Sequence, residues 1–451
     1  MPVELITANQ LQRMPILILL AGILILILLI ARLQLNAFLA FILVSLLIGI
    51  ANGMDISHTV SAIQKGMGDL LGSLTIILGL GAMLGKLIAT SGAAQQIATS
   101  LVKAFGQKYL LWALVLTAFV IGIPLFYGVG FVLLVPLIIT ISYKYKISAV
   151  YIGLPMLAAL SVTHGYLPPH PSPTALVAQY HADMGITLFY GLLIAIPAIL
   201  IGGPLFAQTL KNYTAKPLEA FAAKPLPDEA LPGLFNSIVA SFLPVLLISI
   251  ATIARLLIHQ ENIFTKIILA LGEPVIAMLI TVLYAIYMLG IKRGKNTKDV
   301  MTIVGEGVKD IALILFIIGG AGALKEVLTD TGTSTAIAGS LLQMKVHPLL
   351  AAWGISAVIR VALGSSTVAG LTTAGIIAPM IATSGIDANL MVLATGAGSL
   401  MFSHVNDPGF WMFKEYFNLS FKDTLKTWSV METIVSVVGL IGVFIIYSSI
   451  K

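Results

Sequence analysis

Long apolar stretches separated by short polar ones run along nearly the whole chain of 451 residues. A helix of about 20 apolar residues crosses the hydrocarbon layer of a bilayer, and most of these stretches reach that length. The alternation therefore predicts an all-α polytopic membrane protein. The expected apolar segments are 14–31, 35–53, 66–89, 109–142, 148–165, 185–209, 234–258, 264–290, 348–382, 388–405 and 428–449.

The composition agrees with this prediction and excludes several classes of protein. Hydrophobic residues make up 58% of the chain and charged residues 10%, whereas a soluble domain carries about 25% charged residues. We therefore exclude a soluble binding module. The net charge of +6 is assigned to cytoplasmic loops rather than to nucleic-acid binding. The chain has no cysteine, which excludes disulfides and thiolate ligands, and we expect no metal or other cofactor.

An apolar helix runs into a cluster of prolines in residues 154–173, LPMLAALSVTHGYLPPHPSP. Proline lacks a backbone N–H and clashes with the preceding turn, so Pro168 and Pro169 cannot continue the helix. We expect the backbone to unwind near Thr163 and His164. Hydrocarbon offers no partners for freed N–H and C=O groups, so such a break must line a cavity or be covered by protein.

The same pattern recurs in the second half of the chain, at 393–410, LATGAGSLMFSHVNDPGF. There Ser403 and His404 take the places of the threonine and histidine of the first break. Basic loops place the two copies upside down relative to each other. Inverted repeats with paired interrupted helices are typical of secondary transporters, which bind substrate near the membrane midplane.

The predicted organisation follows from these repeats. Repeat 1 would hold the segment 109–142, which is either a kinked span or a hairpin that enters and leaves on one face, and a broken helix at 148–165. Repeat 2 would hold a hairpin near 348–382 and a broken helix at 388–405. The expected units are N-terminal scaffold helices (1–65), repeat 1 (66–184), scaffold helices with cytoplasmic linkers (185–306), repeat 2 (307–412), and a C-terminal loop with the last span (413–451).

Arg360 lies inside an apolar segment, where a charge is costly and needs a partner. It could clamp the carboxylate of an anionic substrate, or it could pair with a protein carboxylate or lie near the interface. Asp407 follows the second break and is a candidate for three roles: the partner of Arg360, a proton carrier, or the start of a cytoplasmic loop. Asn406 stands beside it as a candidate ligand.

A tip of small and hydroxyl residues follows the arginine, formed by Gly364, Ser365, Ser366 and Thr367. Such a tip can present N–H and O–H donors to an anion, or it can be a flexible turn. His164 and His404 at the paired breaks could exchange a proton near neutral pH. They could equally be hydrogen-bonded structural residues.

Four further charged residues lie in apolar segments. Asp69 and Asp310 correspond by repeat and stand at the expected starts of spans, so we predict that they cap helices. Lys325 and Glu326 are expected to form a pair at the membrane interface. Residues 54–65, which precede the first of these spans, are predicted to form a polar loop.

Five segments carry a resemblance to a known family: VTHGYLPPHPSPTAL (162–176), GALKEVLTDTG (322–332), RVALGSSTVAGLTTAG (360–375), SHVNDPGFWMFKEYF (403–417) and KTWSVMETI (426–434). At these segments the sequence resembles the gluconate permease family of proton symporters. The resemblance implies uptake of gluconate or a related sugar acid, driven by protons, across a bacterial inner membrane. Members of the family transport other small hydroxy acids and D-serine, so the substrate could also be one of these.

The family is in turn similar to the ion transporter superfamily. That similarity implies a homodimer, two inverted repeats, re-entrant hairpins and elevator movement of a transport domain. It places hairpin tips at Gly122–Gly130 and Gly364–Thr367 and unwound helices at Thr163–His164 and Ser403–His404. The implied substrate contacts are Tyr127, Gly128, Thr163, His164, Arg360, Gly364, Ser365, Ser366, Thr367, Ser403, His404 and Asn406. The candidates for proton coupling are His164, His404 and Asp407.

Two other classes of function compete with transport. Ser403, His404 and Asp407 could suggest an intramembrane hydrolase, but adjacent Ser and His on one stretch of backbone do not easily form a nucleophile–base pair. The chain also lacks a G-x-S-x-G elbow. A channel would need a continuous polar path, whereas the sequence shows isolated breaks. We therefore expect a transporter rather than an enzyme, with a sugar acid and the lipid bilayer as its partners.

Overall fold

Helices form all of the regular structure in the part of the chain that can be described. The computed structural model describes residues 3–125, 127–211, 213, 226–258, 262–333, 336, 346–404 and 407–450, and no strand occurs among them. Seven helical segments within these ranges are long and apolar enough to cross a membrane. The prediction of an all-α, multi-pass membrane protein is confirmed.

The helices fall into three groups along the chain. We call residues 93–180 the first core and residues 348–424 the second core. The helices outside them are α1 (Val3–Ile27), α2 (Ala37–Ala51), α3 (Ile56–Thr90), α9 (Met184–Leu200), α10 (Leu234–Leu257), α11 (Ile263–Leu271), α12 (Pro274–Ala285), α13 (Thr297–Asp330) and α20 (Val430–Ile450). The first core contains α4 (Ala93–Phe105), α5 (Leu110–Gly122), α6 (Tyr127–Tyr145), α7 (Ala149–Tyr166) and α8 (Pro171–Tyr180). The second contains α15 (Pro348–Leu363), α16 (Ser366–Ser384), α17 (Ala388–Gly398), α18 (Pro408–Tyr416) and α19 (Phe421–Thr424).

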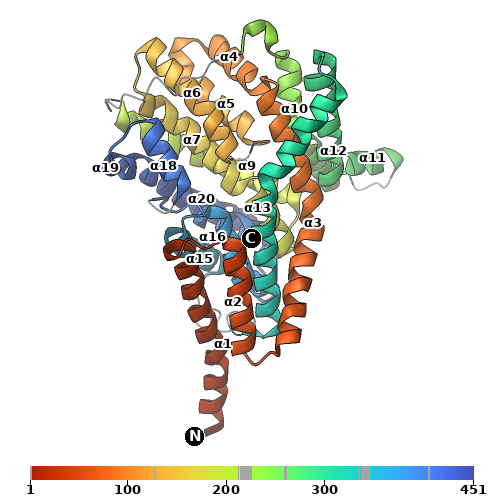
Figure 1. Ribbon diagram of the computed structural model, residues 1–451, viewed down its shortest axis with the longest axis vertical. Coiled ribbons are helices and arrows are strands. Elements are labelled where there is room, and N and C mark those ends of the chain that lie inside the picture. Colours follow the sequence, from red (N-terminus) through yellow and green to blue (C-terminus); the bar gives the residue numbers. More distant parts are fainter. Residues whose placement is uncertain are drawn as a thin grey trace.

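The two longest helices, α3 and α13, lie side by side through the lower half of the molecule (Figure 1). Asp55 begins α3 by accepting a hydrogen bond from the backbone N–H of His58 at 2.9 Å. Asn296 begins α13 by accepting one from the N–H of Asp299 at 2.8 Å. A side-chain oxygen at the N-cap satisfies a free N–H and lets a helix begin there. The predicted polar loop 54–65 is therefore wrong, because the helix starts at Ile56.

Glycines let α3 and α13 touch backbone to backbone. A Cβ atom placed on Gly66 would lie 2.3 Å from the carbonyl oxygen of Gly322, and one on Gly322 would lie 2.4 Å from that of Gly66. A Cβ on Gly307, the counterpart of Gly66 in the second repeat, would lie 2.6 Å from the carbonyl oxygen of Ala82. Small residues at a membrane helix crossing permit this close approach, so the pair is tightly fixed at two related points.

Ion pairs close both ends of the crossing. Lys65 of α3 pairs with Glu326 of α13 at one end. At the other end the ammonium of Lys86 lies 3.0 Å from a carboxylate oxygen of Asp310. The two pairs join the same helices at opposite ends of their apolar contact.

Two predictions about charged residues are wrong at these positions. Asp69 and Asp310 do not cap helices, because both helices begin more than a turn earlier. Lys325 and Glu326 do not pair with each other, since adjacent residues on a helix point in different directions. Glu326 binds the lysine of α3, and the ammonium of Lys325 donates to the carbonyl oxygen of Gln179 at 3.4 Å.

In the first core, α5 and α6 pack against each other and both pack against α7. This packing favours the hairpin over the kinked span. The expected unwinding at Thr163 and His164 is wrong, because both residues lie in the last turn of α7. A proline restricts the residue before it to an extended conformation, and Leu167, which precedes Pro168, has φ −106° and ψ 117°. The break therefore falls at residues 167–170, after the histidine.

In the second core, α15 and α16 pack against each other as a hairpin. Its turn lies at Gly364, whose φ of +76° is a left-handed conformation that glycine adopts readily. The helix α17 ends at Gly398 and α18 begins at Pro408. Ser403 and His404 lie in the non-helical segment between them.

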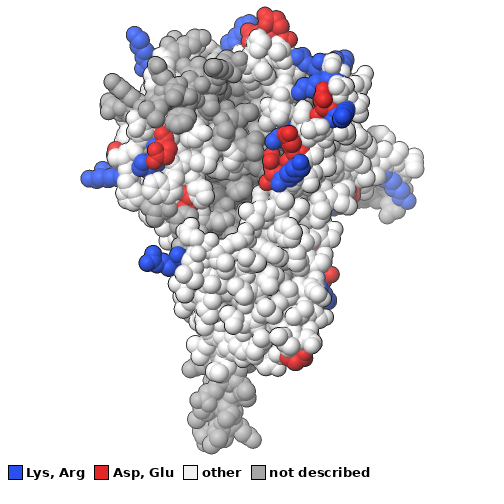
Figure 2. Space-filling model, viewed as in Figure 1, with Lys and Arg blue, Asp and Glu red and all other residues white. Residues whose placement is uncertain are grey.

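The predicted span 264–290 is also wrong, because two helices replace it. Glu273 caps α12 by accepting hydrogen bonds from the N–H groups of Val275 and Ile276 at 2.9 and 3.1 Å. A short α11 precedes this cap and projects from the body of the molecule (Figure 1). Figure 2 shows a broad surface over the lower half that bears few charged side chains, as expected for a surface in contact with lipid.

Candidate functional site

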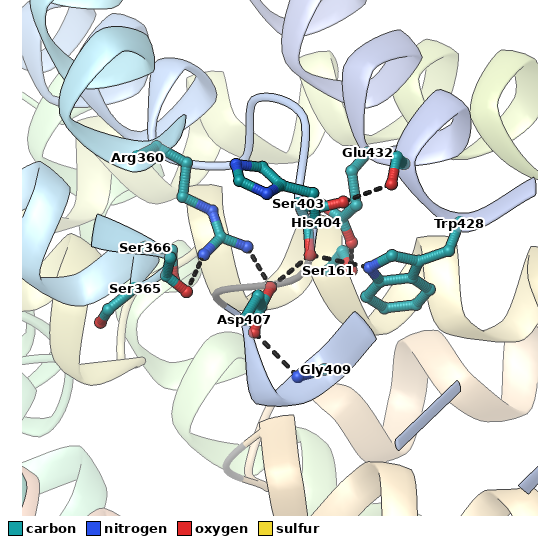
Figure 3. Close-up of polar contacts among 12 residues, drawn as sticks. Ser161, Arg360, Ser365, Ser366, Ser403, His404, Asp407, Gly409, Trp428 and Glu432 are labelled. Atoms are coloured by element: carbon teal, nitrogen blue, oxygen red, sulfur yellow. Dashed lines mark hydrogen bonds and ion pairs between the residues drawn. The ribbon is translucent and has the colours of Figure 1, made fainter. Parts of the chain in front are cut away.

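The turn of the second hairpin meets the non-helical segment that follows α17. Arg360 on α15 is buried, with 5% of its surface exposed. One of its terminal nitrogens donates to the carbonyl oxygen of Gly364, and the other pairs with Asp407 (Figure 3). Of the alternatives for these residues, the structure supports the pair between arginine and protein carboxylate. Asp407 also caps α18 by accepting from the N–H of Gly409 at 2.8 Å.

The non-helical segment is held by the start of the last long helix. Ser403 donates its hydroxyl to Asp407 and accepts a hydrogen bond from the indole N–H of Trp428 at 2.8 Å. Its carbonyl oxygen accepts from the hydroxyl of Ser429 at 2.5 Å. Groups freed by the interrupted helix are thus bonded to protein, as a low-dielectric environment requires. Two of these partners lie on the π-helical segment Leu425–Ser429 that leads into α20.

The end of α7 approaches the same hairpin turn from the first core. The His164 ring nitrogen Nε2 lies 3.1 Å from the hydroxyl oxygen of Ser366. The ring also lies 5.8 Å from that of Tyr127 and 5.4 Å from that of His170, between centroids. Within the described chain, His164 Nδ1 and the Tyr127 hydroxyl are buried and have no hydrogen-bond partner. These two atoms are the candidates in this region for binding a polar ligand.

Other predicted site residues lie around this centre or away from it. Ser365 caps α16 by accepting from the N–H of Val368 at 3.3 Å, and Thr367 follows in the first turn. Thr163 bonds the carbonyl oxygen of Leu160 at 2.9 Å. Gly128 lies on α6 with open space around it.

The second histidine bonds to the backbone of α15. His404 Nε2 lies 2.8 Å from the carbonyl oxygen of Val361. Asn406 lies outside the described residues. The structure therefore brings His164, Ser366, Arg360 and Asp407 to one place, and Figure 3 shows His404 beside this centre, bonded to the backbone of α15.

Sequence reasoning missed a carboxylate at this site. Glu432 on α20 is buried, with 2% of its surface exposed, and accepts a hydrogen bond from the hydroxyl of Ser161 at 2.5 Å. Trp428 lies one helical turn before Glu432 in the chain, and the centroid of its ring is 6.3 Å from that of Tyr127. A glutamate inside an apolar span is itself a signal of function. The segment 426–434 contains this signal, but it lies outside the interrupted helices on which the prediction of the site was based.

The geometry does not form a hydrolytic triad. Ser403 bonds Asp407 and Trp428, while His404 faces a backbone carbonyl, so no histidine activates this serine. Among the residues described, no group of three or more histidine and acidic side chains is placed to hold a metal ion. The centre offers one guanidinium and several hydroxyls, which are the groups that bind a small hydroxylated anion, and it also contains two buried carboxylates.

Comparison with known proteins places these features in context. The model of a family described as GntP family permease matches residues 14–450. The high-affinity gluconate transporter of Escherichia coli (strain K12) is 47% identical over 431 residues, covering 95% of this chain and 98% of that protein. The L-idonate transporter of the Gnt-II system in the same organism is 46% identical, with 96% and 99% covered. The gluconate permease of Bacillus subtilis (strain 168) is 45% identical, with 95% and 98% covered.

Two solved structures share the fold at low sequence identity. The Alcanivorax borkumensis YdaH transporter is 17% identical, with a TM-score of 0.65, and the match covers 91% of this chain and 97% of that one. Neisseria gonorrhoeae MtrF is 14% identical, with a TM-score of 0.65 and coverage of 90% and 94%. Both matches extend over nearly the whole chain, so the helical architecture is shared with these two proteins.

Proposed function

The chain belongs to the GntP family of permeases, and from that premise we propose that it imports gluconate or a related sugar acid by proton symport. The observation that carries the proposal is the buried Arg360 at the hairpin turn, with Asp407 and the hydroxyl of Ser366 beside it. Relatives named for gluconate and for L-idonate transport both handle polyhydroxy carboxylates. The bacterial relatives support a location in the inner membrane.

Arg360 supplies the positive charge for the substrate carboxylate in this proposal. Its Nε atom has no hydrogen-bond partner within the described chain. A substrate carboxylate can bind this free N–H in a charge-assisted hydrogen bond. The unpartnered Tyr127 hydroxyl and His164 Nδ1, together with Ser366, are then placed to bind the substrate hydroxyls.

We further propose that the two cores form one transport domain of an elevator, in a homodimer of inverted repeats. The order of elements supports this, because a helical hairpin followed by an interrupted helix occurs in each half of the chain. The glycine-lined contact of α3 with α13 suits a stationary part, since backbone contact resists sliding. The substrate would then travel with the hairpin turns.

The test is uptake of labelled gluconate into proteoliposomes with an imposed pH gradient, alkaline inside. We expect uptake that rises with the gradient, collapses with a protonophore and is competed by L-idonate. Uptake of another small hydroxy acid in place of gluconate would keep the mechanism and change the substrate. Failure of every sugar acid and small hydroxy acid to enter would overturn the proposed function.

A further inference from the structure

Glu432 is a buried carboxylate that lacks a cationic partner. It lies on the first turn of α20, and one of its oxygens accepts the hydrogen bond from Ser161 of α7. Its other oxygen, Oε2, is buried without a hydrogen-bond partner in the part of the chain described. Figure 3 shows Glu432 on the opposite side of Ser403 from Arg360. A carboxylate in such a place is accommodated most easily when it binds a proton.

Few charged or titratable groups face this glutamate. They come from four neighbouring elements: Tyr127 on α6, Tyr166 on α7, Arg360 on α15 and Asp407 before α18. The helix α17, which packs along α20, carries no titratable side chain. On the other packed elements, Tyr190 of α9 neighbours Asp387 instead, and Lys426 is exposed.

The single guanidinium near the site is already engaged. Arg360 uses one terminal nitrogen for Gly364 and the other for Asp407, which neutralises it. An ionised Glu432 therefore adds a negative charge that the site does not balance. A substrate anion that enters beside it meets like-charge repulsion in a low-dielectric setting.

We propose that Glu432 is the proton-binding group that couples the proton to the substrate, an inference that rests on the proposed transport of a sugar acid. The carboxylate takes one proton from water on the outer side and becomes a neutral acid. The site then carries one negative charge less, and the anion binds. After the site opens inward, the anion leaves and the O–H bond of the acid breaks, so that the proton passes to water.

The three groups first considered for this role are less suited to it. Asp407 accepts hydrogen bonds from Arg360, Ser403 and the N–H of Gly409. Protonating Asp407 would remove the negative charge that balances Arg360. The ring nitrogen Nε2 of His404 is already bonded to the backbone carbonyl oxygen of Val361. His164 shares the site with Arg360, and adding a second positive charge beside that arginine is unfavourable.

The test measures proton uptake when gluconate binds to the full-length protein in detergent. Isothermal titration calorimetry in two buffers of different ionisation enthalpy gives the number of protons taken up per gluconate. We expect about one proton for the wild type, with affinity that weakens about tenfold per pH unit on the alkaline side. Glu432→Gln mimics the protonated acid and should bind gluconate with no proton uptake and no such pH dependence. Asp387→Asn, which changes a carboxylate at the start of α17, should keep the wild-type proton uptake.

Each outcome decides between the alternatives. Proton uptake that persists in Glu432→Gln would overturn the inference, as would gluconate binding to the wild type without proton uptake. No binding to the wild type would instead count against the proposed substrate. If Glu432→Gln does not bind, Ser161→Ala provides the second measurement, because it keeps the carboxyl group but removes its hydrogen bond. The pH midpoint of proton uptake should then move, and an unmoved midpoint would overturn the inference.

Discussion

Replacing Asp407 with asparagine tests the central ion pair. The asparagine side chain carries no charge, so Asp407→Asn leaves Arg360 buried without a counter-charge. Asparagine can still accept from the N–H of Gly409, so the cap of α18 is retained. The loss of stability therefore reports the charge of the residue rather than the end of the helix.

The structure sets the magnitude of this loss. Arg360 is 5% exposed and Asp407 is 14% exposed at the side chain. Removing one partner of such a buried pair costs about 3–5 kcal/mol, because the other charge stays buried and unpaired. A substrate carboxylate can supply the missing negative charge. We therefore expect Asp407→Asn to bind gluconate more tightly than the wild type, so that gluconate stabilises it more than the wild type at the same gluconate concentration.

The assay is unfolding in mixed micelles, followed by circular dichroism with and without gluconate. Asp387→Asn is the matched control, because Asp387 also caps a helix, accepting from the N–H of Asn389 at 2.7 Å. Its replacement should change the free energy of unfolding by less than about 1 kcal/mol. An Asp407→Asn protein as stable as this control would refute the reasoning.

Three further changes test other parts of the structure. Gly322→Ala should lower the free energy of unfolding by about 1–3 kcal/mol, because its Cβ atom would meet the backbone of α3. Gly354→Ala is the control and should not lower it, because there is open space around Gly354. Thermal melting in detergent compares the two variants. Ser366→Ala removes the hydroxyl beside His164 and should raise KM for gluconate uptake by up to about tenfold; an unchanged KM would exclude this contact. Arg360→Lys should raise KM by at least about tenfold with little loss of folded protein, because lysine lacks the planar fork of arginine; size-exclusion chromatography monitors the folding.

Local signals in the sequence were enough to predict most of the helices, but they placed several ends wrongly. The prolines at 168 and 169 do end the helix, but the extended conformation that they impose falls on Leu167, the residue directly before them. For that reason Thr163 and His164 remain helical. At the start of α3, the cap at Asp55 outweighed the polar character of the residues that follow it.

The composition of the site depended on contacts that sequence spacing does not specify. His164 meets Ser366, and Ser161 meets Glu432, only because helices far apart in the chain pack together. Arg360 was recognised from its place in an apolar segment, since a buried charge stands out in such surroundings. Glu432 is likewise a charged residue inside an apolar segment, the predicted span 428–449, so the same criterion identifies it.

The ion pairs at the two ends of the α3–α13 contact are separated by a distance close to the thickness of a membrane. With a rise of about 1.5 Å per residue, Lys65 and Lys86 lie about 32 Å apart along α3. This matches the ~30 Å hydrocarbon thickness of a bilayer, which leaves both charged pairs at the headgroup layers. A thinner or thicker bilayer would force the pair to tilt or would draw one charged end into hydrocarbon. The stability of the glycine-lined contact between α3 and α13 should therefore depend on the lipid chain length of the bilayer.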